Sequence, residues 1–166
     1  LVAFERAVEL YEGTYGHRHA FVAVARSNYG GLLIRMGRLE DAQRELETAL
    51  SIYRESDGAQ QWSPFIAGCL NFMGKLELER EGYAKALEHF EEAHEIVVAK
   101  HGRQSAHLLG SHLGRGEALL GLGRARDALG PLELGVKLTE SEDVGSQDRG
   151  LLYFALAKAL YASGQG

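Results

Sequence analysis

Only a few residues of this chain have types and spacings that could carry out chemistry. The segment that begins at Gly68 and ends at Lys75 has a glycine, a short run, a second glycine and then a lysine, as phosphate-binding loops do. Five residues rather than four separate the two glycines, and Leu76 stands where a Ser or Thr would bind magnesium. The apolar spacing around the segment predicts a helix rather than a loop. We therefore expect no nucleotide site.

The histidine and cysteine residues are too scattered to predict a metal site or a nucleophile. His17 and His19 could ligate a metal from a loop, but no Cys, Asp or Glu lies nearby in the sequence to complete a site. Cys69 falls next to small-residue packing positions of a predicted helix, so we expect a buried, inert thiol. A single cysteine also excludes a disulfide framework. The sequence thus predicts no metal, no cofactor and no catalytic cysteine.

Two polar residues, His112 and Arg115, occupy positions at which packing residues are usual. Either they form an ion pair with a neighbouring glutamate or they contact a ligand, and the sequence leaves both interpretations open. No protein-kinase motif accompanies them, because Gly135–Leu138 lies in a predicted helix and neither an Asp-Phe-Gly nor a His-Arg-Asp triplet occurs. We expect this chain not to be an enzyme.

The composition is that of a folded protein in water. Hydrophobic residues make up 45% and charged residues 25% of the 166 residues, and no apolar run approaches the roughly 18 residues that cross a bilayer. The net charge is −5, and the arginines are scattered among acidic residues, which argues against nucleic-acid binding. We expect a reducing, cytoplasmic location. The chain begins directly in a predicted helix, which indicates a piece of a longer protein.

The strongest pattern in the sequence is an internal repeat. One block occurs four times, with first residues 42, 44 and 42 positions apart, at Phe4–Leu10, Leu46–Ile52, Phe90–Ile96 and Leu132–Leu138. A second block keeps the same register at Gly37–Ala42, Glu81–Ala86 and Gly123–Ala128, and Gly164 begins a fourth copy. Two blocks in one register over four copies predict a repeat protein.

The residues between these blocks have the spacing of amphipathic helices. Large residues recur at i, i+3 and i+7 with a small residue at i+4, and the small positions are Gly30, Gly74, Gly116 and Ala157. We expect these to face small residues of the next helix such as Ala42, Ala86 and Ala128, so that the helices approach closely. Positive φ is expected just after the first helix of each pair, at Gly37, Gly123 and Gly164.

Over essentially its whole length, this pattern resembles the tetratricopeptide repeat. The large-x-x-large-small-x-x-large first helix and the Gly-x-aromatic-x-x-Ala second helix of that family match the positions given above. The repeat length resembles the variety of about 42 residues found in kinesin light chains and many bacterial regulators. In that variety Gly-Pro-x-His-Pro introduces the inner helix, and Gly16–Ala20 and Trp62–Pro64 occupy that place here.

The chain also departs from the family pattern. Glu81 stands at a usual glycine, Glu77 and Arg115 stand at apolar positions, and Pro131 lies inside a predicted outer helix. The segment 116–128 further resembles the C-terminal repeat arrays of large bacterial serine/threonine kinases.

The resemblance implies an all-α fold, a right-handed superhelical α-solenoid of antiparallel helix pairs whose inner helices line a concave face. We expect one solenoid over 1–166, with an orphan outer helix in 1–15, repeats at 16–58, 59–102 and 103–143, and an orphan inner helix in 144–166. Neither end is expected to be capped. Phe4, Val8 and Tyr11 should therefore lack an upstream partner, and Leu156 and Leu160 should lack a following helix.

In this family a partner binds inner-helix positions one, five and eight residues after the first large position. Carried over to this chain, these are Ser27, Gly31, Ile34, Asn71, Lys75, Leu78, Leu113, Glu117, Leu120, Phe154, Lys158 and Tyr161. Asn71 matches the groove asparagine of kinesin light chains, which contacts the backbone of an extended peptide, and Asn28 lies one residue out of that register. The expected peptide-binding set is Ser27, Asn28, Ile34, Asn71, Lys75, Leu78, Leu113, Glu117, Phe154 and Lys158.

The types of these residues indicate what kind of ligand to expect. Lys75 and Lys158 flank Glu117, which suggests a ligand of mixed or mildly acidic charge. Apolar anchoring could come from Leu78, Leu113 and Phe154. Ser27 and Gly31 stand where family members that hold a terminal carboxylate have Lys and Asn, so we expect no two-carboxylate clamp.

The sequence as a whole predicts a non-enzymatic scaffold that binds a peptide or protein segment on its concave face, as part of a larger bacterial signalling or regulatory protein. An alternative is a structural role in which the exposed terminal helices dock end to end and the chain self-associates, as a homodimer for example. The expected partner is a protein, with neither nucleic acid nor membrane involved.

Overall fold

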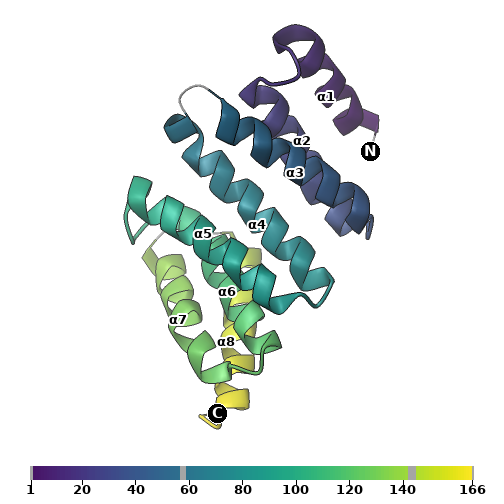
Figure 1. Ribbon diagram of the computed structural model, residues 1–166. Helices are drawn as coiled ribbons and strands as arrows, with labels where there is room; N and C mark the ends of the chain where they lie inside the picture. The colour runs from purple at the N-terminus through teal and green to yellow at the C-terminus, as the bar shows by residue number, and fades with distance from the viewer. Residues whose placement is uncertain (1, 57–58, 142–144, 166) are drawn as a thin grey trace.

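The computed structural model describes residues 2–56, 59–141 and 145–165. These residues form eight α-helices and two short 3-10 turns, η1 (Ala59–Trp62) and η2 (Ala106–Leu108). The helices are α1 (Val2–Tyr15), α2 (Ala20–Arg35), α3 (Leu39–Glu55), α4 (Ser63–Glu79), α5 (Tyr83–His101), α6 (Leu109–Gly121), α7 (Ala125–Ser141) and α8 (Ser146–Ser163). They follow one another along a superhelix, with the two termini at opposite ends (Figure 1).

Each helix packs mainly on its neighbours in the sequence, as a solenoid requires. Consecutive helices contact one another from α1 to α8. The alternate helices α2, α4, α6 and α8 also contact one another, and this places them on the inner side of the curve. The expected all-α solenoid of antiparallel helix pairs is confirmed. The division of the chain into repeats at 16–58, 59–102 and 103–143 stays an interpretation.

The apolar spacing of the sequence produces one continuous core along this stack. The largest cluster joins α2, α3, α4 and α5, and Leu46, Tyr53 and Leu70 in it are almost wholly buried. A second cluster joins α6, α7 and α8. Phe90 of α5 lies between them, in contact with Ala86 and Ala118. Because every repeat buries its apolar face only against its neighbours, the core is as long as the stack itself.

Small residues of the inner helices allow close contact with the outer ones, and large side chains lie there as well as the expected alanine: a methyl group at Gly30 would lie 3.4 Å from the carbonyl oxygen of Ala42. A methyl group added at Gly30 would lie 2.7 Å from Cγ of Leu46, and one at Gly74 would lie 2.6 Å from Cζ of Phe90. The large side chain that packs on each glycine therefore belongs to the residue four positions after the expected alanine, which is Leu46 after Ala42 and Phe90 after Ala86. Ala157 is exposed because no outer helix follows α8 in the described residues.

The helix ends confirm the predicted role of glycine. Gly37, Gly123 and Gly164 have φ of +72°, +71° and +75°. Glu81, at the corresponding position of the next repeat, has the same left-handed backbone with φ of 58° although it carries a side chain. This conformation costs a non-glycine residue about 1–2 kcal/mol.

Of the three residues of α1 that were expected to lack a partner, two are exposed and one is buried. Phe4 and Tyr11 are exposed to 37% and 40%, as expected for a helix with no partner before it. Val8 is buried, because it lies on the face of α1 that packs on α2. No helix in the described part of the chain is long and apolar enough to span a membrane.

Candidate functional site

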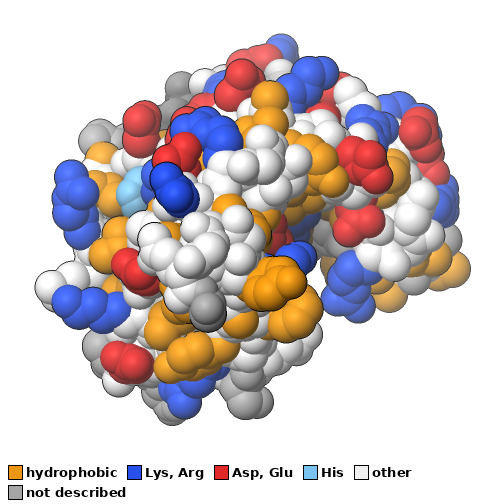
Figure 2. All heavy atoms as spheres, turned by 90° about the horizontal axis from the view of Figure 1, so that it is seen from below, with side chains coloured by type: hydrophobic (Ala, Val, Ile, Leu, Met, Phe, Trp, Pro, Cys, Tyr) orange, Lys and Arg blue, Asp and Glu red, His pale blue; other side chains and the backbone are white. Residues whose placement is uncertain are grey.

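The inner helices α4, α6 and α8 surround a hollow of about 770 Å³ on the concave face. Its lining residues come from the end of α4, the start of α5, the last turns of α6 and the last turns of α8: Leu78, Glu79, Glu81, Tyr83, Glu117, Leu120, Gly121, Lys158, Tyr161 and Ala162. Figure 2 shows a hollowed part of the surface in which acidic and basic side chains lie beside hydrophobic ones. A hollow of this volume is in the range of ligand sites.

The structure brings several of the predicted binding residues into this hollow. Leu78, Glu117 and Lys158 of the expected set line it, and so do two further residues at carried-over positions, Leu120 and Tyr161. Leu78, Leu120 and Tyr161 occupy the same position of three successive repeats on α4, α6 and α8, so corresponding positions meet on one face. Lys75 is exposed one turn before Leu78 on α4.

The predicted residues of α2 do not form an accessible surface. Ser27 and Ile34 are buried, with 6% and 9% of their surface exposed, and only Asn28 is exposed. Phe72 of α4 lies against α2, where a methyl group on Gly31 would come within 2.6 Å of its ring. The expectation that Ser27 and Ile34 face a ligand is therefore wrong for this structure, because α2 and α4 pack too closely there.

Glu117 has the most perturbed environment of the residues in the hollow. Although its side chain is accessible, the surrounding protein atoms desolvate it, and this raises the pKa of its carboxyl above the usual value. Lys158 and Lys75 oppose the increase in pKa, and Glu79 adds to it. Lys75 and Lys158 were predicted to flank Glu117, and both act electrostatically on its carboxyl, Lys75 from α4 and Lys158 from α8.

Exposed aromatic side chains accompany Lys158 on α8. Nζ of Lys158 lies 5.6 Å from the ring centroid of Phe154, within reach of a cation–π contact. Phe154 and Tyr161 are exposed to 67% and 85%, which is unusual for side chains of this size. Leu113, the remaining apolar residue of the expected set, is half-buried and packs on the cluster of α6, α7 and α8.

Asn71 is held between α4 and α6 rather than free in the groove. Its Nδ2 atom lies 3.3 Å from the place that a methyl group on Gly110 of α6 would take. Its Oδ1 atom is buried and has no hydrogen-bond donor among the described residues. This oxygen can accept a hydrogen bond from a backbone N–H of a ligand only when the Asn71 side chain turns out of the packing between α4 and α6.

His112 and Arg115 lie away from the concave face, in the packing between α5 and α6. His112 is buried with its ring centroid 5.1 Å from that of His94. Burial, together with the nearby His94 and Arg115, lowers the pKa of His112 to about 4. Nδ1 of both histidines and Nε of Arg115 lack a partner in the described ranges, so the expected ion pair with a glutamate is not formed there.

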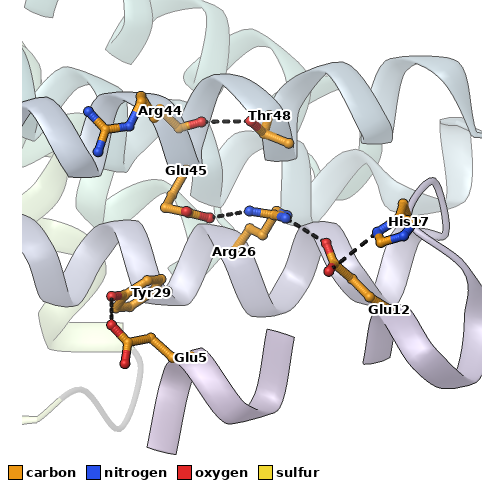
Figure 3. A network of polar contacts seen from close by, with 8 residues as sticks. All are labelled: Glu5, Glu12, His17, Arg26, Tyr29, Arg44, Glu45 and Thr48. Carbon is orange, nitrogen blue, oxygen red and sulfur yellow. Dashed lines mark hydrogen bonds and ion pairs between the residues drawn. The ribbon is translucent and has the colours of Figure 1, made fainter. Parts of the chain in front are cut away.

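A polar network at the other end of the stack was missed by the sequence analysis (Figure 3). Arg26 of α2 donates to Glu12 of α1 at 2.5 Å and to Glu45 of α3 at 2.6 Å. The hydroxyl of Tyr29 donates to Glu5 of α1 at 2.7 Å. Arg26 occupies the first large position of its repeat, where an apolar residue is usual, and this departure was the available signal. The network joins three helices, and Nε of Arg26 is buried without a hydrogen-bond partner in the described residues.

Three of the chemical candidates have structural roles. The segment from Gly68 to Lys75 lies inside α4, which confirms the predicted helix. Cys69 is buried with its Sγ 3.5 Å from the carbonyl oxygen of Leu46, and burial raises the pKa of the thiol to about 11. His17 lies 3.3 Å from Glu12. Among the described residues no group of three His, Cys, Asp or Glu could hold a metal.

Comparison with known proteins matches one part of the chain to a known family. Residues 1–55 match the sequence profile of the tetratricopeptide repeat. The curated proteins gave no match in a sequence comparison.

Solved structures resemble the whole chain. BtubC (BKLC) from P. vanneervenii has a TM-score of 0.82 at 20% identity, over 98% of this chain and 67% of that one. A kinesin light chain of P. anserina with nearly identical TPR-like repeats has a TM-score of 0.73 at 18% identity, over 98% and 76%. The TPR-like protein ct2138 of Chlorobium tepidum has a TM-score of 0.69 at 15% identity, over 87% and 94%. At these identities the likeness concerns the fold.

Proposed function

We propose that this chain, a tetratricopeptide-repeat protein, is a non-enzymatic scaffold that binds a peptide or protein segment on the concave face of α4, α6 and α8. The observation that carries this proposal is the hollow of about 770 Å³, in which corresponding positions of three repeats present apolar and charged side chains together. Repeats of this family generally bind proteins or peptides, and the similar P. anserina structure is named as a putative kinesin light chain.

The binding residues in this proposal divide by what they offer. Asn71 provides an amide that holds the backbone of an extended segment regardless of its sequence. Charge comes from Lys75, Glu117 and Lys158, and apolar contacts come from Leu78, Leu113, Leu120, Phe154 and Tyr161. Asn28 extends this surface toward α2.

The wider setting of the scaffold is part of the same proposal. We place it in the cytoplasm, as a segment of a larger bacterial signalling or regulatory protein. The resemblance of segment 116–128 to the repeat arrays of bacterial serine/threonine kinases supports this setting. A single cysteine that is buried and not in a disulfide is compatible with a reducing compartment.

A capture experiment tests the concave face. The wild-type chain and an Asn71→Ala, Phe154→Ser, Tyr161→Ser variant are immobilised and exposed to a bacterial lysate, after circular dichroism has shown equal helix content. We expect the wild type to retain a partner that the variant retains at least about tenfold less. A Leu134→Ser variant is the matched control, because Leu134 is 54% exposed on the outer helix α7. Equal capture by the concave variant and the wild type would contradict the proposal.

Self-association through the ends is a second candidate function. Val2 and Leu10 of α1 are exposed to 77% and 56%, and α8 exposes Tyr153, Phe154 and Tyr161. Apolar surface of this kind at both ends of an open solenoid can dock on a second copy. Light scattering at rising concentration tests it: a monomer at every concentration would remove this candidate, whereas a dimer that Tyr153→Ser abolishes would support it.

A further inference from the structure

The hollow on the concave face carries more negative than positive charge. Three carboxylates line it, those of Glu79, Glu81 and Glu117, and Lys158 supplies the one ammonium group among its lining residues. Lys75 is near enough to lower the pKa of Glu117 but does not line the hollow. The lining therefore has a formal charge of −2, which attracts cations.

Within the part of the chain that the structure describes, these carboxylates are not held in close ion pairs, although Lys75 and Lys158 act electrostatically on Glu117 from farther away. In the described residues, Glu79, Glu81 and Glu117 have no ion pair within 4.0 Å. Arg80 lies between two of them in the sequence, but its guanidinium donates to Gln43 of α3 at 2.7 Å and pairs with Glu40 at 3.4 Å. Lys158 is held over the ring of Phe154. The carboxylates of the hollow are thus left to interact with a group from outside.

The walls of the hollow suit a long side chain with a charged end. Leu78 and Leu120 offer aliphatic contact, and Tyr83 and Tyr161 offer aromatic rings beside the carboxylates. Arginine and lysine bury their aliphatic stems along apolar surface and place the charge at its far end. A guanidinium also stacks on aromatic faces and pairs with carboxylates through two parallel hydrogen bonds.

We infer that this hollow binds an arginine-bearing basic segment of a partner protein, whose guanidinium pairs with Glu79, Glu81 and Glu117 while neighbouring apolar residues lie against Leu78, Leu120 and Tyr161. The inference rests on the proposed function and names the chemistry of its ligand. It differs from the ligand of mixed or mildly acidic charge that Lys75 and Lys158 suggested, because Glu79 and Glu81 line the hollow although they lie outside the groove positions of the family. An acidic segment or a second copy of this chain are the competing occupants.

Fluorescence anisotropy with labelled peptides tests this choice. The probes are three peptides of equal length that share Leu and Tyr at the same positions and carry Arg, Gln or Glu at the others. We expect the Arg peptide to bind the wild-type chain at least about tenfold more tightly than the Gln peptide, and the Glu peptide most weakly. The affinity for the Arg peptide should also fall as salt rises.

Variants of the chain assign the binding to this hollow. A Glu79→Gln, Glu117→Gln variant should lose about tenfold in affinity for the Arg peptide and little for the Gln peptide. Glu133→Gln, an exposed position on the outer helix α7, should change neither. The inference would be overturned if the Arg peptide did not bind, or if it bound the Glu79→Gln, Glu117→Gln variant as tightly as the wild type. Tighter binding of the Glu peptide than of the Arg peptide would also overturn it.

The proposed function can survive failure of the inference. If the concave variant loses its captured partner from a lysate while the Glu peptide binds best, the scaffold is real and its ligand is acidic. If light scattering shows a dimer that Glu117→Gln dissociates, the occupant is a second copy. If neither capture nor any peptide binding depends on the concave face, both proposals fail.

Discussion

The two ends of this solenoid use charged side chains in opposite ways. Near α1 to α3, Arg26 is clamped between Glu12 and Glu45. Between α4 and α8, Glu117 has no ion pair within 4.0 Å in the described residues. The buried His112 has a pKa of about 4 and is therefore neutral near pH 7, and its Nδ1 atom has no hydrogen-bond partner there. The same repeat thus supports helix-joining ion pairs at one end and polar groups without close partners at the other. Ion pairs fix the helices, and a polar group without a partner is either a stability cost or a means of recognition.

The largest expected effect concerns the unpaired histidine. Because the pKa of His112 is about 4 when folded and about 6.5 when unfolded, the unfolded chain binds the additional proton in this interval. Its contribution to stability is complete above pH 6.5, and about 3 kcal/mol of unfolding free energy is lost as the pH falls to 4. His94 and Arg115 face His112, and Arg103 and Glu95 act on His94.

Urea unfolding at several pH values measures this loss. The difference between the wild type and a His112→Leu variant isolates the contribution of His112 from that of the carboxylates. We expect the loss between pH 6.5 and 4 to be smaller in the variant. The same slope in both proteins would show that His112 is not the group that titrates.

At the paired end, removal of Arg26 should destabilise the chain. Arg26→Met leaves Glu12 and Glu45 close to each other without a cation, at a cost of about 2 kcal/mol of unfolding free energy. Its side chain is 21% exposed, so the cost is below that of a fully buried pair. Thermal unfolding of Arg26→Met beside Arg26→Met, Glu12→Gln checks it, because the second change should restore part of the loss. No loss in the single variant would contradict the clamp.

Two glycines of α4 give the next prediction. Gly74→Ala should lower the unfolding free energy by about 1–2 kcal/mol, because the added methyl group meets the buried ring of Phe90 at 2.6 Å. Gly68→Ala in the same helix meets nothing within 4 Å and should raise stability by about 0.5–1 kcal/mol. Chemical denaturation compares them. Equal effects of the two substitutions would show that helix propensity, and not packing on α5, determines both changes in stability.

A smaller gain is expected at the rim of the hollow. Glu81→Gly should raise the unfolding free energy by about 0.5–1 kcal/mol, because glycine takes a φ of 58° without strain. Gly123→Ala is the inverse control, since its φ is +71° and the added methyl group would have open space. If Glu81→Gly destabilises the chain in thermal unfolding, the Glu81 side chain contributes more to stability than its left-handed backbone conformation costs.

The smallest effect should come from Glu117→Gln. A carboxylate kept for a partner adds little to the folded chain, so we expect a change within about 0.5 kcal/mol in the free energy of unfolding. Denaturant unfolding of the two proteins at pH 7 measures it. A clear loss of stability would mean that Glu117 holds helices together as the acids around Arg26 do.

The sequence predicts the positions of the helices but not the surfaces that form between them. The register of small positions such as Gly30 and Gly74 predicts where helices lie and how closely they pack. It does not predict that Phe72 packs against Gly31 or that Ser27 and Ile34 are buried, because this depends on how α2 and α4 pack. The positive φ at Gly37 and Gly123 could be predicted because it depends on the local backbone alone.

The polar contacts were the least predictable part. Glu12 and Glu45 reach Arg26 from positions 14 and 19 residues away, on different helices. Glu79 and Glu81 enter the hollow because the superhelix brings the end of α4 next to α6 and α8, and no local spacing encodes this curvature. A charged residue at a usual apolar position, or a non-glycine at a usual glycine, was the signal available in both cases.

Site-specific photocrosslinking tests most directly whether a partner occupies the concave face. The photoreactive residue p-benzoylphenylalanine is placed at Tyr161, which lines the hollow, or at Leu134, which is 54% exposed on the outer helix α7. After irradiation in the bacterial lysate, mass spectrometry identifies the crosslinked proteins. We predict a partner crosslinked from position 161 and absent from position 134. Crosslinking from position 134 alone, or from both positions equally, would contradict the concave-face account.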